Sequence, residues 1–260
     1  MNTPKKIYFA SDFHLGAPDH TTSLKREKII CQWLHHIKAD AERIFLLGDL
    51  FDFWFEHQYT VPKGFVRLLG TLAELSDAGI PIEIIVGNHD MWMKNYLQHE
   101  LNLIIHHDQP IIRTYYNKTL MIGHGDGLGP NDNYYKFIKK IFRNPFCQWA
   151  FARLHPNLSF RIAHYFSKKS RIYTGITDEK FLGKENEWLY IYCQKTLQKQ
   201  HIDYFIFGHR HLPLSIPLQN QSKYINLGDW IKYYTFATLD AHSLQLKQYP
   251  SQKIINDFMP

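Results

Sequence analysis

The sequence predicts an α/β fold built around a sheet that is at least partly parallel. Short apolar runs typical of β-strands recur along the 260-residue chain, and stretches with helical spacing separate the first three of them. Hydrophobic residues make up 45% of the chain, which is enough for a substantial core in one large domain. This composition excludes a disordered chain, a coiled coil and a disulfide scaffold.

Five apolar runs are the strands on which the prediction rests, and they cover residues 7–10, 44–47, 82–86, 120–122 and 204–207. The helical spacing that separates the first three lies near residues 23–37 and 65–78. Residues 223–227 and 235–246 indicate further strands, which we expect to be antiparallel. Strands alternating with helices are typical of parallel β-α-β units.

Polar side chains of the metal-ligand type follow each of the five runs. The tetrapeptides or pentapeptides that follow are Ser11-Asp12-Phe13-His14, Gly48-Asp49-Leu50-Phe51-Asp52, Gly87-Asn88-His89-Asp90, Gly123-His124-Gly125-Asp126 and Gly208-His209-Arg210-His211. Open α/β sheets place their sites at the carboxyl ends of the strands. We therefore expect these five loops to converge on one site.

The chemistry of that site follows from its donor atoms, which are two carboxylates, one amide and four imidazoles. Oxygen and imidazole ligands favour Mn²⁺, Fe²⁺ or Zn²⁺ over a thiophilic metal. Two such ions that share a carboxylate would stabilise both oxygens of an in-line displacement at phosphorus. The candidate ligands are Asp12, His14, Asp49, Asn88, His124, His209 and His211.

The ordered motifs Asp-x-His, Gly-Asp-x-x-Asp, Gly-Asn-His-Asp, Gly-His and Gly-His-x-His span residues 12 to 211 and resemble the calcineurin-like metallophosphoesterase superfamily. The resemblance implies a four-layer α/β/β/α sandwich. It implies that one ion is held by Asp12, His14, Asp49 and His211, and a second ion by Asp49, Asn88, His124 and His209. It also implies that His89 protonates the leaving oxygen or stabilises charge on the phosphoryl group, with Asp90 orienting His89.

Other polar residues near these motifs have simpler interpretations. We expect Asp52 to serve the loop after the bridging carboxylate, and Asp126 to orient the imidazole of His124. Five further histidines are expected to be structural or solvated, because a lone histidine in a chain with 16 of them is more often surface or core than ligand; they are His35, His36, His57, His106 and His107.

A basic and aromatic stretch separates the fourth motif from the fifth. Residues 133–177 contain nine Lys or Arg and no Asp or Glu, while the whole chain has a net charge of +6, so the rest of the chain is slightly acidic. The stretch also holds eleven aromatic residues, and its spacing predicts short helices broken near Asn144-Pro145 and His155-Pro156-Asn157. Such an insertion suits an amphiphilic phosphate compound. Two alternatives are a helical cap whose aromatics form its own core, and a surface for nucleic acid.

Longer motifs resemble one family more closely, the UDP-2,3-diacylglucosamine pyrophosphohydrolases of lipid A biosynthesis. These motifs are Ser-Asp-x-His-Leu at 11–15, Gly-Asp-Leu-Phe-Asp-Phe-Trp at 48–54, His-Gly-Asp-Gly-Leu at 124–128 and Leu-Gly-Asp-Trp at 227–230. The resemblance implies a core of residues 1–130 and 201–260 and a helical lid of residues 131–200 that takes acyl chains. It implies hydrolysis at the α-phosphate to UMP and 2,3-diacylglucosamine 1-phosphate, with Mn²⁺ as the usual metal and Fe²⁺ or Zn²⁺ as alternatives.

The same resemblance implies which residues lie near the sugar phosphate, namely Asn88, Asp132, Lys168, Lys169 and Arg171. One position departs from the family, whose members carry Gly-Asn-Arg-Asp where this chain has His89. Arginine grips a diphosphate with two parallel hydrogen bonds and histidine cannot. A metallophosphodiesterase acting on a soluble nucleotide or cyclic nucleotide therefore stays as an alternative, as does a non-catalytic binding module.

Partners and location follow from charge, cysteines and apolar runs. We expect a lipid-linked UDP-sugar as substrate, peripheral contact with an anionic membrane surface, and no nucleic acid. Three widely spaced cysteines, Cys31, Cys147 and Cys193, indicate reduced thiols. No apolar run reaches the roughly 18 residues of a membrane span, and the first residues do not have the form of a signal peptide. These features predict a cytoplasmic protein that lies peripherally on the inner membrane.

Overall fold

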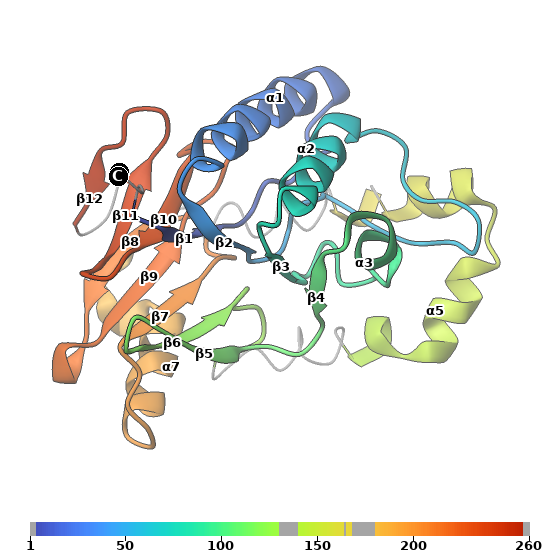
Figure 1. The fold of residues 1–260 in the computed structure, drawn as a ribbon. Helices are drawn as coiled ribbons and strands as arrows, with labels where there is room; N and C mark the ends of the chain where they lie inside the picture. The colour runs from blue at the N-terminus through green and yellow to red at the C-terminus, as the bar shows by residue number, and fades with distance from the viewer. Residues whose placement is uncertain (1–3, 130–139, 164, 168–179, 257–260) are drawn as a thin grey trace.

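Two β-sheets pack face to face and helices cover their outer faces in the computed structural model of the chain (Figure 1). The structure describes residues 4–129, 140–163, 165–167 and 180–256. Helices and strands alternate along the first half of the chain, as the apolar runs predict, and most of the later strands follow one another without a helix.

The first sheet has seven strands in the spatial order β12-β11-β10-β1-β2-β3-β4. Strands β1 to β4 are parallel to one another, and β10 joins β1 in the antiparallel direction. Their bounds are β1 (Lys6–Ala10), β2 (Ala41–Leu46), β3 (Ile82–Ile85), β4 (Ile104–His106), β10 (Thr235–Leu239), β11 (Leu244–Gln248) and β12 (Ile254–Ile255).

The second sheet has five strands in the order β5-β6-β7-β9-β8. Strands β6, β7 and β9 are parallel, and the two edge strands β5 and β8 are antiparallel to their neighbours. Their bounds are β5 (Ile111–Tyr115), β6 (Lys118–Gly123), β7 (Tyr204–Phe207), β8 (Pro213–Pro217) and β9 (Lys223–Leu227).

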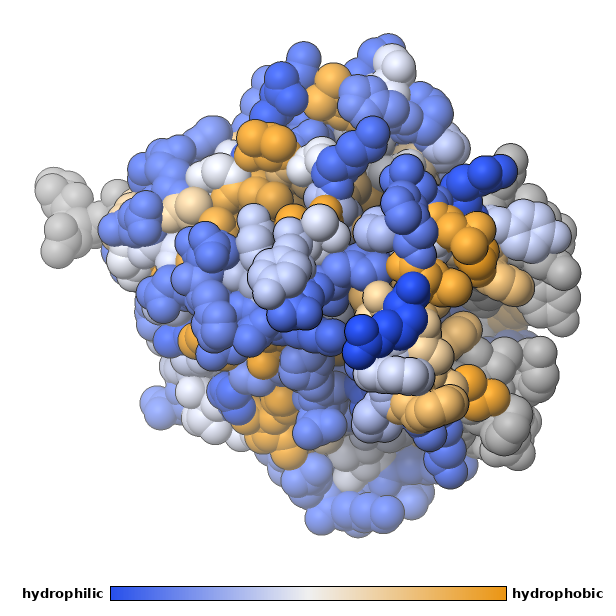
Figure 2. Space-filling model, turned by 90° about the vertical axis from the view of Figure 1, so that its right-hand side faces the viewer, coloured by the Kyte–Doolittle hydropathy of each residue, from blue (hydrophilic) through white to orange (hydrophobic). Residues whose placement is uncertain are grey.

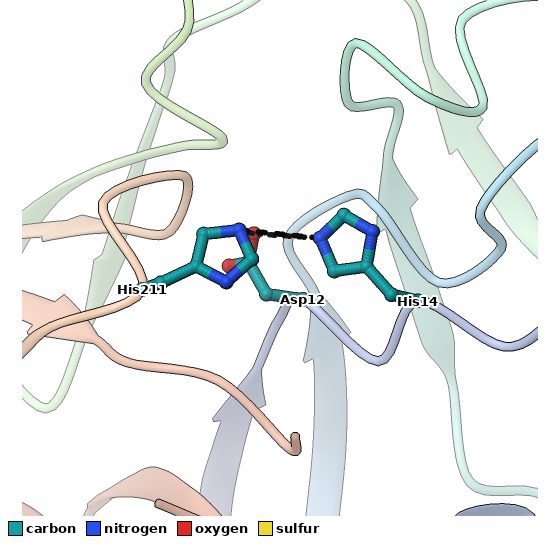
Figure 3. Close-up of side chains that lie close together, drawn as sticks. All are labelled: Asp12, His14 and His211. Carbon is teal, nitrogen blue, oxygen red and sulfur yellow. Dashed lines mark hydrogen bonds and ion pairs between the residues drawn. The ribbon is translucent and has the colours of Figure 1, made fainter. Parts of the chain in front are cut away.

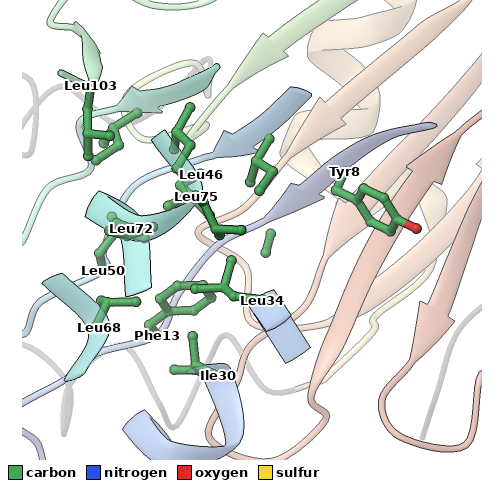
Figure 4. Close-up of a cluster of buried hydrophobic side chains, with 14 of the residues drawn as sticks. Tyr8, Phe13, Ile30, Leu34, Leu46, Leu50, Leu68, Leu72, Leu75 and Leu103 are labelled. Atoms are coloured by element: carbon green, nitrogen blue, oxygen red, sulfur yellow. The ribbon is translucent and has the colours of Figure 1, made fainter. Parts of the chain in front are cut away.

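Helices α1 (His20–Ile37), α2 (Val66–Asp77) and α3 (Tyr96–Leu101) lie on the outer side of the first sheet. Helix α1 begins where the side chain of Asp19 accepts a hydrogen bond from the backbone N–H of Thr22. Leucines of α2 and apolar residues of α1 pack on those side chains of β1 to β3 that face the helices, and together they form one buried cluster (Figure 4).

The space between the two sheets forms a second core. Because side chains alternate along a strand, β1 sends Ile7 and Phe9 toward the second sheet and Tyr8 and Ala10 toward the helices. Ile122 and Ile206 of the second sheet pack in the same cluster as Ile7 and Phe9. Two-sided burial explains why the parallel strands are continuous apolar runs.

Helix α7 (Trp188–Leu197) covers the outer face of the second sheet. Its residues Leu189 and Cys193 lie four apart on one face of the helix and are fully buried against Phe205 and Phe207. The four-layer α/β/β/α arrangement implied by the family resemblance is thereby confirmed. Helix α7 supplies the fourth layer, although it lies inside the range 131–200 that the sequence assigned to the lid.

The described part of the insertion consists of short helices on the right-hand side of Figure 1. Helix α5 (Pro145–Ala152) begins at the proline, and the Asn144 side chain caps it by accepting hydrogen bonds from Phe146 N and Cys147 N. A further helical stretch runs over residues 156–163. Both breaks that the sequence predicted are therefore confirmed. Among the described helices, none has the length and apolar character needed to cross a bilayer.

Candidate metal centre

The carboxyl ends of parallel strands from both sheets meet at one edge of the sandwich. Strands β1, β2 and β3 end there from the first sheet, and β6 and β7 end there from the second. The loops that follow bring together side chains from residues 12 to 211, with the candidate ligand atoms of each group of three within 4.8 Å of one another. The three groups are Asp12, His14 and His211; Asp49, His124 and His209; and His14, Asp49 and His89.

The backbone at this edge is held in an unusual conformation. Five of the seven predicted ligands have a positive φ, a region that non-glycine residues rarely adopt. Each such residue costs on the order of 1–3 kcal/mol, and such strain gathers at functional sites. The five are Asp12 (φ 57°), His14 (φ 43°), Asp49 (φ 52°), His209 (φ 68°) and His211 (φ 53°).

The first group lies between the loop after β1 and the loop after β7 (Figure 3). The Nε2 atoms of His14 and His211 face each other at 3.2 Å. Asp12 Oδ1 lies 3.8 Å from His14 Nε2 and 3.5 Å from His211 Nε2. Three ligand-type atoms from two distant segments therefore point at one small volume.

The second group lies beside the first, and its Asp49 also faces His14 of the first group. Asp49 Oδ2 is 3.4 Å from His124 Nε2 and 3.6 Å from His14 Nε2, so one oxygen faces both groups. His124 Nε2 also lies 3.0 Å from Asn88 Oδ1. A carboxylate in this position has the geometry of a bridging ligand.

Two glycines allow the loops to approach so closely. A Cβ at Gly87 would lie 2.2 Å from Asp49 Oδ1, and a Cβ at Gly208 would lie 2.6 Å from Asp12 Oδ2. Any larger residue would push the two carboxylates out of place. Gly87 and Gly208, each of which precedes a ligand motif, are therefore required by packing at the site.

Hydrogen bonds from outside the groups fix the orientation of the ligands. His124 Nδ1 is 2.7 Å from the carbonyl oxygen of Leu47, which leaves Nε2 to face Asp49. Asp12 Oδ2 accepts a hydrogen bond from His209 N at 3.0 Å. Asp49 Oδ1 accepts one from His89 N at 2.8 Å, so Oδ2 faces the histidines.

The electrostatics of the centre keep both aspartates ionised. Burial alone raises the pKa of Asp49, but the neighbouring His124 and His89 outweigh burial and hold it well below its usual range. The pKa of Asp12 is lowered in the same way, because His14 and His211 outweigh its burial. Burial lowers the pKa of His124, but Asp49 outweighs burial and raises it to about 10. His124 must therefore release a proton to act as a ligand.

The residues present fit a pair of divalent cations. Asp12 Oδ1 is buried and has no hydrogen-bond partner among the residues that the structure describes. An uncompensated buried carboxylate oxygen is costly unless a cation faces it. Asp12, His14 and His211 lie together, Asp49, His124 and His209 lie together, and Asn88 lies beside His124. The chain thus carries a dinuclear site for divalent metal ions.

His89 lies at the edge of this centre. Its Nδ1 is 3.0 Å from the carbonyl oxygen of Asp52 and 3.2 Å from the hydroxyl of Ser167. Burial lowers its pKa to about 4. The grouping with His14 and Asp49 also brings its ring within reach of an ion, which the sequence did not predict.

Asp90 and Asp126 accept hydrogen bonds that the sequence did not predict. The oxygens of Asp90 accept hydrogen bonds from Gly87 N at 2.7 Å and Leu50 N at 2.8 Å, so Asp90 joins the loops after β2 and β3. Asp126 accepts a hydrogen bond from Gln109, whose own Oε1 accepts one from His124 N. Their contacts are thus with main-chain and amide groups.

The predicted substrate residues are only partly visible. Asn88 lies in the centre, beside His124. Asp132, Lys168, Lys169 and Arg171 lie outside the described residues. Of the histidines expected to be structural, His106 bonds to Glu83 and His35 to Glu74, both away from the centre.

Three side chains near the ligands were missed by sequence reasoning. Ser167 of the insertion bonds to His89, as described above. Arg210 stands in the sequence between the predicted ligands His209 and His211. It pairs with the buried Glu187, which precedes α7. Asp229 contacts His211 Nδ1 at 3.2 Å. The Leu-Gly-Asp-Trp motif contains Asp229 and was the one available signal for it.

Comparisons with known proteins show which family and which proteins the chain resembles. The chain matches the calcineurin-like phosphoesterase family over residues 5–213. A Porphyromonas gingivalis protein named UDP-2,3-diacylglucosamine hydrolase is 36% identical over 256 residues, covering 93% of this chain and 97% of that protein. A protein of the same name from Vibrio vulnificus is 27% identical over 252 residues, covering 93% and 97%. A dimetal phosphatase from Danio rerio aligns over 95% of this chain and 96% of its own, with a TM-score of 0.48 at 12% identity.

Proposed function

Since this chain belongs to the calcineurin-like phosphoesterase family and is a metal-dependent hydrolase, we propose that it cleaves the pyrophosphate of UDP-2,3-diacylglucosamine. The products would be UMP and 2,3-diacylglucosamine 1-phosphate, a step of lipid A biosynthesis. The observation that carries the proposal is the 36% identity to the Porphyromonas gingivalis hydrolase across 93% of the chain, which includes the insertion as well as the core.

The metal centre supplies the chemistry for this reaction. Divalent ions bound there would acidify a water molecule and offset charge on the phosphoryl oxygens. Asp49 would hold both ions through Oδ2, the oxygen that faces His14 and His124. We assign His89 to the reacting phosphoryl group or the leaving oxygen, with its ring oriented by Asp52 O and Ser167. Asp90 would act on it indirectly, through the loops it joins.

The inner side of the insertion anchors it to the core. Phe151 packs on Phe55 and Trp92, with ring centroids 4.9 and 4.7 Å apart. The indole N–H of Trp92 donates to the carbonyl oxygen of Phe142 at 2.6 Å. These contacts account for part of the aromatic content of the insertion as a small core, one of the alternatives left open by the sequence.

The outer side of the insertion is available to an amphiphile. Phe146 and Trp149 stack on each other on α5 and are 71% and 53% exposed. The Arg153 guanidinium lies over the Trp149 ring at 5.2 Å. Figure 2, which turns this side of the molecule to the viewer, shows hydrophobic residues beside strongly hydrophilic ones. Aromatic rings beside cations suit acyl chains and anionic headgroups.

We extend the proposal to the metal and the location. The oxygen and imidazole donor set supports Mn²⁺, with Fe²⁺ and Zn²⁺ as alternatives. The exposed rings and cations support peripheral contact with the anionic cytoplasmic surface of the inner membrane. We further propose that the lid lies within residues 131–200, apart from α7, and that residues 1–130 and 201–260 form the core together with α7. Asp132, Lys168, Lys169 and Arg171 would lie near the sugar phosphate, and we expect that nucleic acid is not a partner.

The function is tested by incubating the Mn²⁺-loaded protein with UDP-2,3-diacylglucosamine in ¹⁸O-water and analysing the products by mass spectrometry. We expect UMP that carries one ¹⁸O atom, because water would attack the α-phosphorus, and unlabelled 2,3-diacylglucosamine 1-phosphate. Faster cleavage of soluble nucleotides or cyclic nucleotides than of the acylated substrate would contradict the proposal and favour the soluble phosphodiesterase.

A further inference from the structure

We propose that Asp229 is a positioning residue, which fixes the tautomer of His211 and thereby its ability to hold a divalent ion through Nε2. Asp229 lies in the turn between β9 and β10, and it is buried. Trp230 N in the same turn donates to Asp12 O at 3.1 Å, so the turn is attached to the loop that carries the first ligands. The inference rests on the metal centre and does not depend on which phosphoester is cleaved.

The His211 ring lies between Asp229 and the first ligand group. On one side, Nδ1 is 3.2 Å from Asp229 Oδ2. On the other side, Nε2 is 3.5 Å from Asp12 Oδ1 and 3.2 Å from His14 Nε2. Figure 3 shows one ring nitrogen of His211 facing His14. This nitrogen, Nε2, would bind the ion, and it is the one opposite the Asp229 contact.

The contact between Asp229 and His211 selects one tautomer of the imidazole ring. A neutral imidazole carries its proton on either Nδ1 or Nε2, and only the unprotonated nitrogen can bind a metal. A carboxylate accepts hydrogen bonds and donates none, so Asp229 requires the proton on His211 Nδ1. The lone pair is then on Nε2, which faces the ion position.

The other oxygen of Asp229 prevents its side chain from turning. Asp229 Oδ1 accepts hydrogen bonds from the backbone N–H groups of Ile231 at 3.0 Å, Lys232 at 2.7 Å and Tyr233 at 3.2 Å. In Asp229→Asn the amide oxygen would keep these three bonds, and the NH₂ group would face His211. Because that group donates, it would force the proton onto Nε2 and remove the ligand atom.

The Nδ1 atom of His124 also faces a hydrogen-bond acceptor, but there the acceptor is a main-chain group. Its Nδ1 faces the carbonyl oxygen of Leu47 at 2.7 Å, and a carbonyl oxygen also only accepts. A main-chain carbonyl cannot be changed by substitution, whereas Asp229 can. The effect of the Nδ1 acceptor on metal binding can therefore be tested for His211, by substitution of Asp229.

The test is a Mn²⁺ titration of the metal-free full chain, with free Mn²⁺ followed by electron paramagnetic resonance. We expect the wild type to bind two equivalents and Asp229→Asn to bind one of them roughly 10- to 100-fold more weakly, the usual effect of removing an outer partner of a metal ligand. The matched control is Asp240→Asn, whose Oδ1 also accepts two backbone hydrogen bonds, from His242 N and Ser243 N. This control should bind both equivalents normally.

Binding of both equivalents by folded Asp229→Asn with wild-type affinity would overturn the inference. If that variant does not fold, ¹⁵N NMR of the metal-free wild type decides, because it reports which nitrogen of His211 is protonated. A proton on Nδ1 supports the inference and a proton on Nε2 refutes it. Neither measurement uses a substrate, so a wrong assignment of the phosphoester would leave both results unchanged.

Discussion

Asp49 is the residue on which the two halves of the metal centre meet. Its Oδ2 lies between His14 Nε2 and His124 Nε2, while Oδ1 is held by His89 N. Asp49 has a positive φ, and only a glycine at position 87 leaves room for its carboxylate. If this oxygen bridges two ions, as we propose, then the binding of each ion depends on the other.

We predict that Asp49→Asn lowers the turnover number by at least about 100-fold, because loss of an outer partner alone costs roughly 10- to 100-fold in a metal site. The substitution keeps Oδ1 for His89 N and replaces the bridging oxygen by an NH₂ group. Steady-state kinetics with Mn²⁺ measure the effect. The matched control is Asp19→Asn, at the exposed start of α1, where asparagine caps a helix as well as aspartate does. Turnover of Asp49→Asn within tenfold of the wild type would contradict the bridging role.

At the scale of elements, the motifs predicted the loops better than they predicted the contacts between loops. Strands β1, β2, β3, β6 and β7 are continuous apolar runs because both of their faces are buried, and such runs are visible in a sequence. Strand β8 has a proline at each end, which weakened its signal and is tolerated at a sheet edge. Strand β4 is only three residues long.

The site was predictable in its ligands and less so in their supports. Asp12, His14, Asn88 and the other ligands stand in ordered motifs, each at the end of a strand. Asp229 reaches His211 across 18 residues through the turn between β9 and β10, and Ser167 reaches His89 across 78 residues. These contacts depend on how separate elements pack, which local spacing does not encode.

An ion-pair network around the buried Glu83 joins strands of the two sheets. Glu83 of β3 pairs with Arg43 of β2 at 2.5 Å, with His106 of β4 at 2.7 Å and with Arg113 of β5 at 3.7 Å. Burial raises the pKa of Glu83, but the hydrogen bond from His106 and the Arg43 charge outweigh it, so the pKa lies below its ordinary value of 4.5. The ionised form of Glu83 is therefore stabilised by folding.

We predict that the stability difference between the wild type and Glu83→Gln is greatest near neutral pH and shrinks as the pH falls below 4.5. A carboxyl group whose pKa is lower in the folded state stabilises the protein above its unfolded pKa, and that contribution is lost as the pH falls through the folded pKa. Urea unfolding from pH 7 to pH 3.5 measures it. In the control Glu74→Gln, whose ion pairs are exposed, the difference should stay smaller. A difference for Glu83→Gln that does not change with pH would refute the prediction.

At the scale of the whole molecule, basic and aromatic residues are concentrated in one segment of the chain. The insertion carries nine basic residues between positions 133 and 177, and the rest of the chain is slightly acidic. In Figure 1, α5 lies at the opposite end of the molecule from β12. This distribution is the reason why we expect the insertion to be the part of the chain that contacts an anionic bilayer.

We predict that the double variant Phe146→Ala and Trp149→Ala binds vesicles of anionic lipid at least about tenfold more weakly, because each ring buries a large apolar area when it enters the interface. Cosedimentation with the vesicles measures the binding. Ile254→Ala, an exposed apolar position on β12, is the matched control and should bind as the wild type does. Equal binding by the double variant would exclude α5 as the contact.

The central claim is that five loops hold two divalent ions around Asp49, and anomalous scattering tests it most directly. Crystals grown with Mn²⁺ and measured near the manganese absorption edge should show two peaks. We expect one peak among Asp12, His14 and His211 and the other among Asn88, His124 and His209, with both in contact with Asp49. A single peak, or peaks away from these side chains, would contradict the account.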